Sequence, residues 1–287
     1  MDINIISFKT LLWIVIFSVI IIFISFGFSY TLDNSKIIFC DVGQGDAIYI
    51  RTSNRTDILI DSGRDGRVLT CLGKYMPIYD RTIELAFLTH PDDDHDGGYI
   101  EVLKRYKILN FYITIEGTDD NYQKMKKLAQ NSLKQIYQGD SLQIGKAHVD
   151  IMWPTRNKLI HNLSTNESSY VMSFHDAPIK VLFTGDIGPE SIHKIISTCK
   201  TKECSDDFQA DILKVPHHGS KHGLTSQLLR KVDPNLSVIS VGKNSYGHPS
   251  KEILELFHTL QKSYVRTDQS GDIVIEYNEK GWWVKEK

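Results

Sequence analysis

The run ELAFLTHPDDDHDGG at Glu84–Gly98 ends an apolar strand and opens a polar loop before two glycines. Ligands that leave the end of a rigid strand can converge on one ion, and closely packed carboxylates stay ionised together only beside a cation. We therefore expect a metal site here, although an acidic helix N-cap with bystander histidines is the alternative. The side chains concerned are His90, Asp92, Asp94 and His95.

Two further segments repeat this order of apolar strand, polar side chain and glycine turn. IKVLFTGDIG ends a strand shortly before Asp186, and DILKVPHHGS ends another before His217 and His218. Because the carboxyl ends of parallel strands lie at one rim of a sheet, we expect these side chains to meet those of the first run. Taken alone, Asp186 also suits a helix N-cap and His217 a core histidine. Together the three segments predict one metal centre.

The order of strand-like and helical segments predicts the fold class. Two strand-rich blocks, each followed by helices, suit an α/β sandwich of two sheets face to face with helices outside. The expected strands are 36–40, 47–51, 57–60, 84–89, 147–153, 170–174, 179–183, 211–215 and 236–241, and a hairpin turns at 278–281. The expected helices are 98–107, 122–130, 189–197, 224–232 and 250–261.

The composition of the 287 residues is that of an ordinary globular protein. It is 41% hydrophobic and 24% charged, with a formal net charge of -2. The chain as a whole therefore exerts no electrostatic pull toward nucleic acid, and polyanion binding would need a local patch or a bound metal.

The N-terminal segment is predicted to be a membrane helix. Residues 10–32 carry no charge, and a helix of that length spans the ~30 Å hydrocarbon core of a bilayer. We expect an uncleaved anchor at 1–32 and a catalytic domain at 33–287 that lies outside the membrane. A cleaved signal peptide, which would make the protein secreted, is the alternative.

The four cysteines do not settle the compartment. Cys40 ends the apolar segment IIFC and is expected to be a small core residue. Cys199 and Cys204 flank a polar loop and are candidates for pairing outside the cell. Cys71 completes the set, and none of the four has the C-x-x-C spacing of a metal site.

These segments resemble the metallo-β-lactamase superfamily, and specifically the hydrolase-like domain of ComEC-type competence DNA-uptake proteins. The resemblance covers nearly all of residues 37–276. It implies an αββα sandwich of two mixed sheets with outer helices, here preceded by the N-terminal membrane helix. The matching motifs are FCDVGQGDAIYI, ILIDSG, THPDDDHDGG, NESSYVMSF, LFTGD, LKVPHHGSK, GHPS and RTDQSGDIVI.

The resemblance also assigns roles by position. Asp61 in ILIDSG matches an acidic residue that supports the metal ligands. Asp92 stands where the commonest pattern has histidine, although the competence branch often has aspartate. The histidine that usually precedes the GD segment has no clear match, and His161 is a weak stand-in for it. The matches to metal ligands are His90, Asp94, His95, the bridging carboxylate Asp186 and the last histidine, His217.

This ligand set predicts two divalent metal ions in unequal positions. The first position has His90, Asp92 and Asp186, with water or His161 completing it. A large share of carboxylate moves the preference from zinc toward manganese or magnesium, so the ions are expected to be manganese or zinc. The second position has a complete set, which is Asp94, His95, His217 and Asp186.

Such a site predicts hydrolysis by a hydroxide that the metals generate. Asp94 is expected to hold the proton of the attacking water. His248 is expected to bind phosphate or protonate the leaving oxygen, and a cap on the helix that begins at Ser250 is its alternative role. The further candidates for supporting the ligands or contacting substrate are Asp46, which also suits a plain turn, His218 and Ser220.

The leading functional hypothesis is a phosphodiesterase or nuclease that acts on DNA outside the membrane in a competence-related role. DNA and a separate membrane channel protein are the expected partners. One alternative is hydrolysis of another ester, such as an envelope phosphoester, a lactone or a β-lactam. The other is a non-catalytic surface module that binds DNA or a partner, for which the missing histidine is the motive.

Overall fold

The protein is described from a computed structural model that covers residues 7–31, 35–156, 164–198 and 208–286. Cys199, Cys204 and His161 lie outside these residues, so the roles expected for them are not described. The chain divides into two compact units, Met1–Asn34 and Ser35–Lys287.

The first unit contains one helix, α1 (Phe8–Thr31). A helix that crosses a bilayer needs about 20 consecutive apolar residues. Among the described residues, no helix combines the length and the apolar character needed for that crossing. The expected membrane anchor at residues 10–32, and the membrane-anchored, extracytoplasmic localisation inferred from it, are therefore wrong.

The second unit contains two mixed β-sheets, which confirms the predicted α/β class. The first sheet has the order β15-β14-β1-β2-β3-β4-β5-β6, and the second has the order β13-β12-β11-β10-β9-β8-β7. The strands of the first sheet are β1 (Ser35–Phe39), β2 (Ile48–Arg51), β3 (Asp57–Ile60), β4 (Thr82–Leu88), β5 (Lys107–Ile113), β6 (Leu133–Lys134), β14 (Ile273–Asn278) and β15 (Gly281–Val284). Those of the second are β7 (Ser141–Ile144), β8 (Ala147–Trp153), β9 (Val171–Asp176), β10 (Ile179–Phe183), β11 (Ile212–Lys214), β12 (Leu236–Ile239) and β13 (Tyr264–Arg266).

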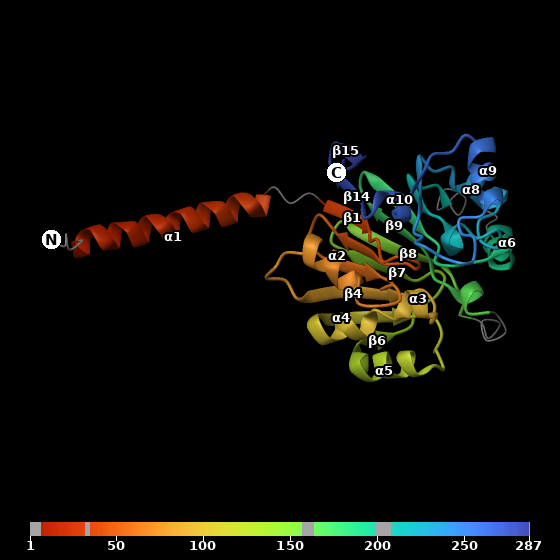
Figure 1. The fold of residues 1–287 in the computed structure, drawn as a ribbon, viewed down its shortest axis with the longest axis horizontal. Coiled ribbons are helices and arrows are strands. Elements are labelled where there is room, and N and C mark those ends of the chain that lie inside the picture. The colour runs from red at the N-terminus through yellow and green to blue at the C-terminus, as the bar shows by residue number, and fades with distance from the viewer. Residues whose placement is uncertain (1–6, 32–34, 157–163, 199–207, 287) are drawn as a thin grey trace. The chain divides into compact units, whose positions relative to one another are not determined.

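Helices cover the outer face of each sheet. In Figure 1, α2, α4 and α5 lie on one side of the sandwich and α6, α8 and α9 on the other. The helices are α2 (Val68–Tyr75), α3 (Asp93–Asp96), α4 (Tyr99–Arg105), α5 (Asp120–Ala129), α6 (Pro189–Thr198), α8 (Ser226–Val232), α9 (Lys251–Thr259) and α10 (Thr267–Ser270). Three short 3-10 turns, η1 (Gln130–Ser132), η3 (Asn166–Ser168) and η4 (Pro216–Gly219), complete the described elements.

Strand β4 shows why these residues form a central strand. Leu85 and Phe87 point into the core between the two sheets. The alternate residues Ala86 and Leu88 pack beneath the outer helices. A strand buried on both faces is apolar along its length rather than alternating, which is the pattern of ELAFL.

Each sheet has a parallel half, and the two parallel halves bring the metal-binding segments together. β3, β4 and β5 run parallel in the first sheet, and β10, β11 and β12 run parallel in the second. Side chains that follow these strands therefore leave at the rim where the strands end. The predicted ligands follow β4, β10 and β11.

One covalent link was not foreseen. Cys40, just after β1, forms a disulfide with Cys71 in α2, with 5.9 Å between the Cα atoms. Both residues are buried, so the expected core position of Cys40 is confirmed, and the disulfide adds a partner that the sequence did not indicate. The link closes a loop that contains both Asp46 and Asp61.

Candidate metal centre

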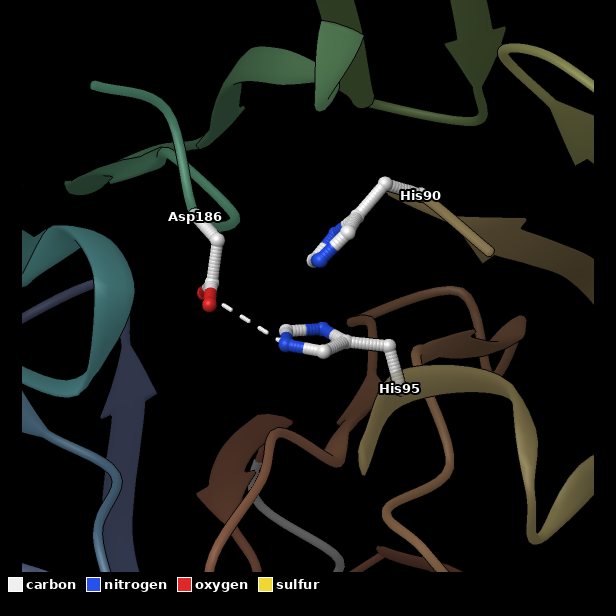
Figure 2. Close-up of side chains that lie close together, drawn as sticks. All are labelled: His90, His95 and Asp186. Carbon is white, nitrogen blue, oxygen red and sulfur yellow. Dashed lines mark ion pairs between the residues drawn. The ribbon is translucent and has the colours of Figure 1, made fainter. Parts of the chain in front are cut away.

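The first cluster of ligands brings together residues from both sheets. Figure 2 shows His90, which follows β4, and His95, in α3, pointing toward Asp186, which follows β10. His95 Nε2 lies 3.4 Å from Asp186 Oδ1, and the ring centroids of His90 and His95 are 4.1 Å apart. All three side chains are buried and could hold one ion between them.

The second cluster shares His95 with the first. Asp94, His95 and His218 have ligand atoms close enough to hold an ion. His218 Nε2 lies 3.5 Å from Asp94 Oδ2 and 3.3 Å from Asp186 Oδ2. Asp186 therefore stands between the two clusters, as a bridging carboxylate requires.

Several buried atoms in these clusters have no hydrogen-bond partner among the described residues. Burying such groups unpaired costs about 1–3 kcal/mol each, whereas a divalent cation would satisfy them together. The donor set of imidazole nitrogen and carboxylate oxygen suits zinc or manganese, so the residues fit a metal centre. The atoms are His90 Nε2, His95 Nε2, His218 Nε2 and Asp186 Oδ1.

The positions of the adjacent residues His217 and His218 relative to the carboxylates differ from the expected ones. We expected His217 as the last ligand and His218 as its neighbour. The structure places the His218 side chain, 1% exposed, against Asp94 and Asp186, while His217 is 26% exposed and its Nε2 lies 3.9 Å from Asp186 Oδ2. The φ angles of both histidines are positive, 50° and 53°, within the turn η4. This turn directs two consecutive rings toward the same carboxylate.

Asp92 and Asn166 lie on the more open side of the candidate centre. Asp92 Oδ2 lies 3.5 Å from His90 Nε2, and its side chain is 37% exposed, so it stands at the open edge of the site. Asn166 Nδ2 lies 3.4 Å from His217 Nε2.

Asp61 holds His95 in the orientation that a metal requires. Asp61 Oδ2 lies 2.8 Å from His95 Nδ1, and its two oxygens also accept hydrogen bonds from the backbone N–H and the hydroxyl of Thr89. With its Nδ1 proton directed at the carboxylate, His95 presents the Nε2 lone pair to the ion. This is the supporting position expected for Asp61.

Backbone and hydroxyl groups orient the other two imidazoles. His218 Nδ1 lies 2.8 Å from the carbonyl oxygen of Ser240, which can only accept, so Nδ1 carries the proton. His90 Nδ1 lies 3.2 Å from Ser169 Oγ. Ser169 Oγ in turn accepts a hydrogen bond from the backbone N–H of Asp186. Ser169 therefore links two ligands, a role that the sequence did not indicate.

Asp46 pairs with a buried lysine, and it also lies among the groups that could hold an ion, beside Asp186 and His218. Lys214, at the end of β11, forms an ion pair with Asp46, and both side chains are almost fully buried. Lys214 Nζ also donates to the carbonyl oxygen of Gly185 and lies 3.9 Å from Asp186 Oδ1. Sequence reasoning did not single out Lys214, although a lysine inside the apolar segment DILKV was a usable signal.

The remaining expected site residues lie at the edge of the centre. The Ser220 side chain is buried, and its Oγ accepts from the backbone N–H of His222, which gives it a role in the turn. The ring centroid of His248 lies 5.5 Å from that of His217. Ser250 Oγ, not His248, accepts from the backbone N–H of Ile253 and caps α9.

The charges around the centre shift the pKa values of His218 and Asp94 so that the charged form of each side chain is favoured. Burial alone would lower the pKa of His218, but the carboxylates of Asp186 and Asp46 raise it to about 10. Burial would likewise raise the pKa of Asp94, but His218 and His95 bring it below its ordinary value. Metal binding must therefore displace protons from the imidazoles, so metal affinity is expected to rise with pH.

The two rim histidines differ from His218. Burial, opposed by Asp186 and reinforced by His218, lowers the pKa of His217. Burial and the neighbouring His217 and His218 lower the pKa of His248. Both imidazoles are therefore neutral at neutral pH.

Comparison with known proteins decides the family. Residues 40–243 match the model of the Metallo-beta-lactamase superfamily. The chain belongs to this superfamily. Membership supports a hydrolase fold that binds divalent metal ions, and it confirms the resemblance inferred from the motifs.

Among curated proteins, the chain is similar to competence proteins. It is 26% identical over 282 residues to ComE operon protein 3 of Bacillus subtilis (strain 168), covering 91% of this chain and 35% of that protein. It is 27% identical over 233 residues to Competence protein ComA of Neisseria gonorrhoeae, covering 80% of this chain and 30% of that protein. The chain therefore spans about a third of the length of these relatives.

Two solved structures share the fold. The metallo-beta-lactamase fold protein YhfI from Bacillus subtilis superposes with a TM-score of 0.54 at 14% identity, covering 85% of this chain and all of that one. Igni18, a metallo hydrolase from Ignicoccus hospitalis, gives a TM-score of 0.53 at 13% identity, again covering 85% of this chain and all of that one.

Proposed function

We propose that this chain is a metal-dependent phosphodiesterase that cuts DNA. The observation that carries the proposal is the set of unpartnered imidazole nitrogens and carboxylate oxygens that converge from both sheets on Asp186. The carboxylate-rich ligand set supports manganese at least as well as zinc. The similarity to competence proteins supports DNA as the substrate.

Most residues of the centre are proposed to bind metal, and Asp94 is also proposed to bind the attacking water. Divalent ions, when bound, supply positive charge at the phosphate and lower the pKa of the attacking water. His90, Asp92 and Asp186 would hold one ion. Asp94, ionised because of its lowered pKa, faces His218 through Oδ2 and can accept a hydrogen bond from water at Oδ1. The second ion would be held by Asp94, His95, His218 and Asp186.

His248 is proposed to contact the phosphate as a neutral donor. Its lowered pKa leaves the imidazole uncharged at neutral pH, so one ring N–H can donate a hydrogen bond to a phosphate oxygen or to the leaving oxygen. Such a group stabilises developing charge without adding a cation that would repel the metals.

The proposal is tested on the purified full-length chain with single-stranded DNA and manganese. We expect Asp186→Ala to abolish cleavage, because it removes the carboxylate shared by both ions. Asp150→Ala is the matched control, since Asp150 lies in β8 and is not among the candidate ligands. Full cleavage by Asp186→Ala would show that this centre does not perform the reaction.

A non-catalytic DNA-binding module is the second candidate, because the first metal position lacks a third histidine. Metal content measured by mass spectrometry separates the two, since a chain that retains no metal in excess manganese would favour the binding module. Under either function, DNA is the proposed partner. A separate channel protein is a further proposed partner, because the competence relatives extend well beyond the shared segment.

A further inference from the structure

The loop 242–250, between β12 and α9, is held in one conformation by a single side chain. Asn244 Nδ2 donates to the carbonyl oxygens of Gly242 and His248, at 2.8 and 2.9 Å. Asn244 Oδ1 accepts from the backbone N–H groups of Tyr246 and His248, at 3.1 and 3.0 Å. These four hydrogen bonds fix the backbone on both sides of Tyr246.

The base of this loop is also fixed against the turn that carries Asp46. A Cβ added to Gly242 would lie 2.3 Å from the carbonyl carbon of Gly43, so the two backbones are in direct contact. Gly43 belongs to the DVGQGDA segment, in which the backbone N–H of Asp46 donates to the carbonyl oxygen of Asp94. Loop 242–250 is therefore positioned by the same turn that borders the metal centre.

Three rings lead from solvent to the metal-binding carboxylate. The ring centroid of Tyr246 lies 5.7 Å from that of His248, and His248 lies 5.5 Å from His217. His217 Nε2 is 3.9 Å from Asp186 Oδ2. Tyr246 is thus the outermost member of a continuous row of rings that ends at the reacting centre.

The outermost ring is left exposed. Tyr246 is 67% exposed, so most of its area does not pack against the protein. Lys243 in the same loop and Lys221, which follows η4, are exposed as well. An exposed aromatic ring on a fixed loop is a feature with which proteins hold single-stranded nucleic acid, because every base has a face that stacks.

We propose that Tyr246 is a stacking subsite for the nucleobase next to the phosphate that the metal centre cuts. This inference rests on the proposed nuclease function and adds its substrate class, which is single-stranded nucleic acid with little preference for sequence. The rigid loop lets the ring accept a base without the cost of ordering it on binding.

The test compares two fluorescent single-stranded oligomers, an oligothymidylate and the same backbone with base-free nucleotides. Binding to the full-length chain is measured in calcium, and cleavage is measured in manganese. We expect Tyr246→Ala to weaken binding of the oligothymidylate by about tenfold and to raise KM by a similar factor with little change in kcat. Binding of the base-free oligomer should not change, and Tyr246→Trp should keep wild-type affinity.

Tyr79→Ala is the matched control, because Tyr79 is 64% exposed and precedes β4 at the end remote from His90. It should bind both oligomers like the wild type. Equal loss for both oligomers in Tyr246→Ala, or no loss for either, would overturn the subsite. Base-dependent binding through Tyr246 without any cleavage would uphold the subsite and refute the nuclease, whereas cleavage that is indifferent to Tyr246 would do the reverse.

Discussion

At the scale of single residues, the metal centre depends on groups that never touch an ion. Asp61 orients His95, Ser240 orients His218, and Ser169 connects His90 to the backbone of Asp186. Such supporting hydrogen bonds fix both the tautomer and the direction of a ligand, and removing one typically weakens metal affinity by 10- to 100-fold.

Asp61→Asn tests this support directly. The amide cannot replace the charged acceptor that faces His95 Nδ1, so we expect manganese affinity to fall by about 10- to 100-fold while the fold is retained. Isothermal titration calorimetry with manganese measures the change. Asp65→Asn, at an exposed carboxylate, should leave the affinity unchanged, and an unchanged affinity in Asp61→Asn would disprove the supporting role.

The motifs indicated the ligand positions but not the division of work between His217 and His218. Consecutive residues point in directions set by local φ and ψ, and the positive φ angles of η4 follow from how that turn packs. The roles of Lys214 and Ser169 have a different cause. Their contacts with Asp46 and His90 join segments far apart in the chain, so they depend on the tertiary fold.

At the scale of elements, the one-turn helix α3 contains a carboxyl group with no partner among the described residues. Both oxygens of Asp96 are buried without a hydrogen bond. Burial, helped by the charges of Asp119 and Asp93, raises the pKa of Asp96 to about 7. The folded chain therefore keeps this proton at a pH where the unfolded chain has lost it.

The sign of the resulting pH dependence follows from linkage. The contribution of the Asp96 carboxyl group to the free energy of unfolding is greatest below about pH 4, and it is lost as the pH rises through about 7. Asp96→Asn cannot ionise, so we expect it to match the wild type near pH 4 and to be more stable at pH 8 by up to about 4 kcal/mol. Urea unfolding at both pH values measures this difference, which should be absent for Asp120→Asn on the surface; parallel pH curves for wild type and Asp96→Asn would contradict the assignment.

Most elements could be predicted from apolar periodicity, and the misses have physical causes. The strand β5 begins at Lys107, where we expected the preceding helix to end, because an apolar run of this length suits a helix or a strand until its neighbours are known. The disulfide partner of Cys40 was unpredictable, since pairing depends on the approach of β1 and α2 in space. The prediction of a membrane helix at the N-terminus rested on hydropathy alone, and it is wrong for the described residues.

At the scale of the whole molecule, bound metal should stabilise the sandwich. Ligands bind the folded chain only, so metal at a hundred times its Kd adds about 2.7 kcal/mol to the free energy of unfolding. For a domain of this size, removing the metal with a chelator should lower Tm by roughly 5–10 °C. Scanning calorimetry checks this, with Asp186→Ala as the control that should show no chelator effect, and an unchanged wild-type Tm would exclude a tightly held ion.

The candidate ligands are divided between the two sheets, so the complete centre forms only when the sheets pack together. His90, Asp94 and His95 come from the first sheet, while Asp186 and His218 come from the second. Each of the two clusters described above, His90 with His95 and Asp186, and Asp94 with His95 and His218, therefore takes ligands from both sheets. A nascent chain would therefore lack both complete clusters until the two sheets had packed together, so tight metal binding is expected only late in folding.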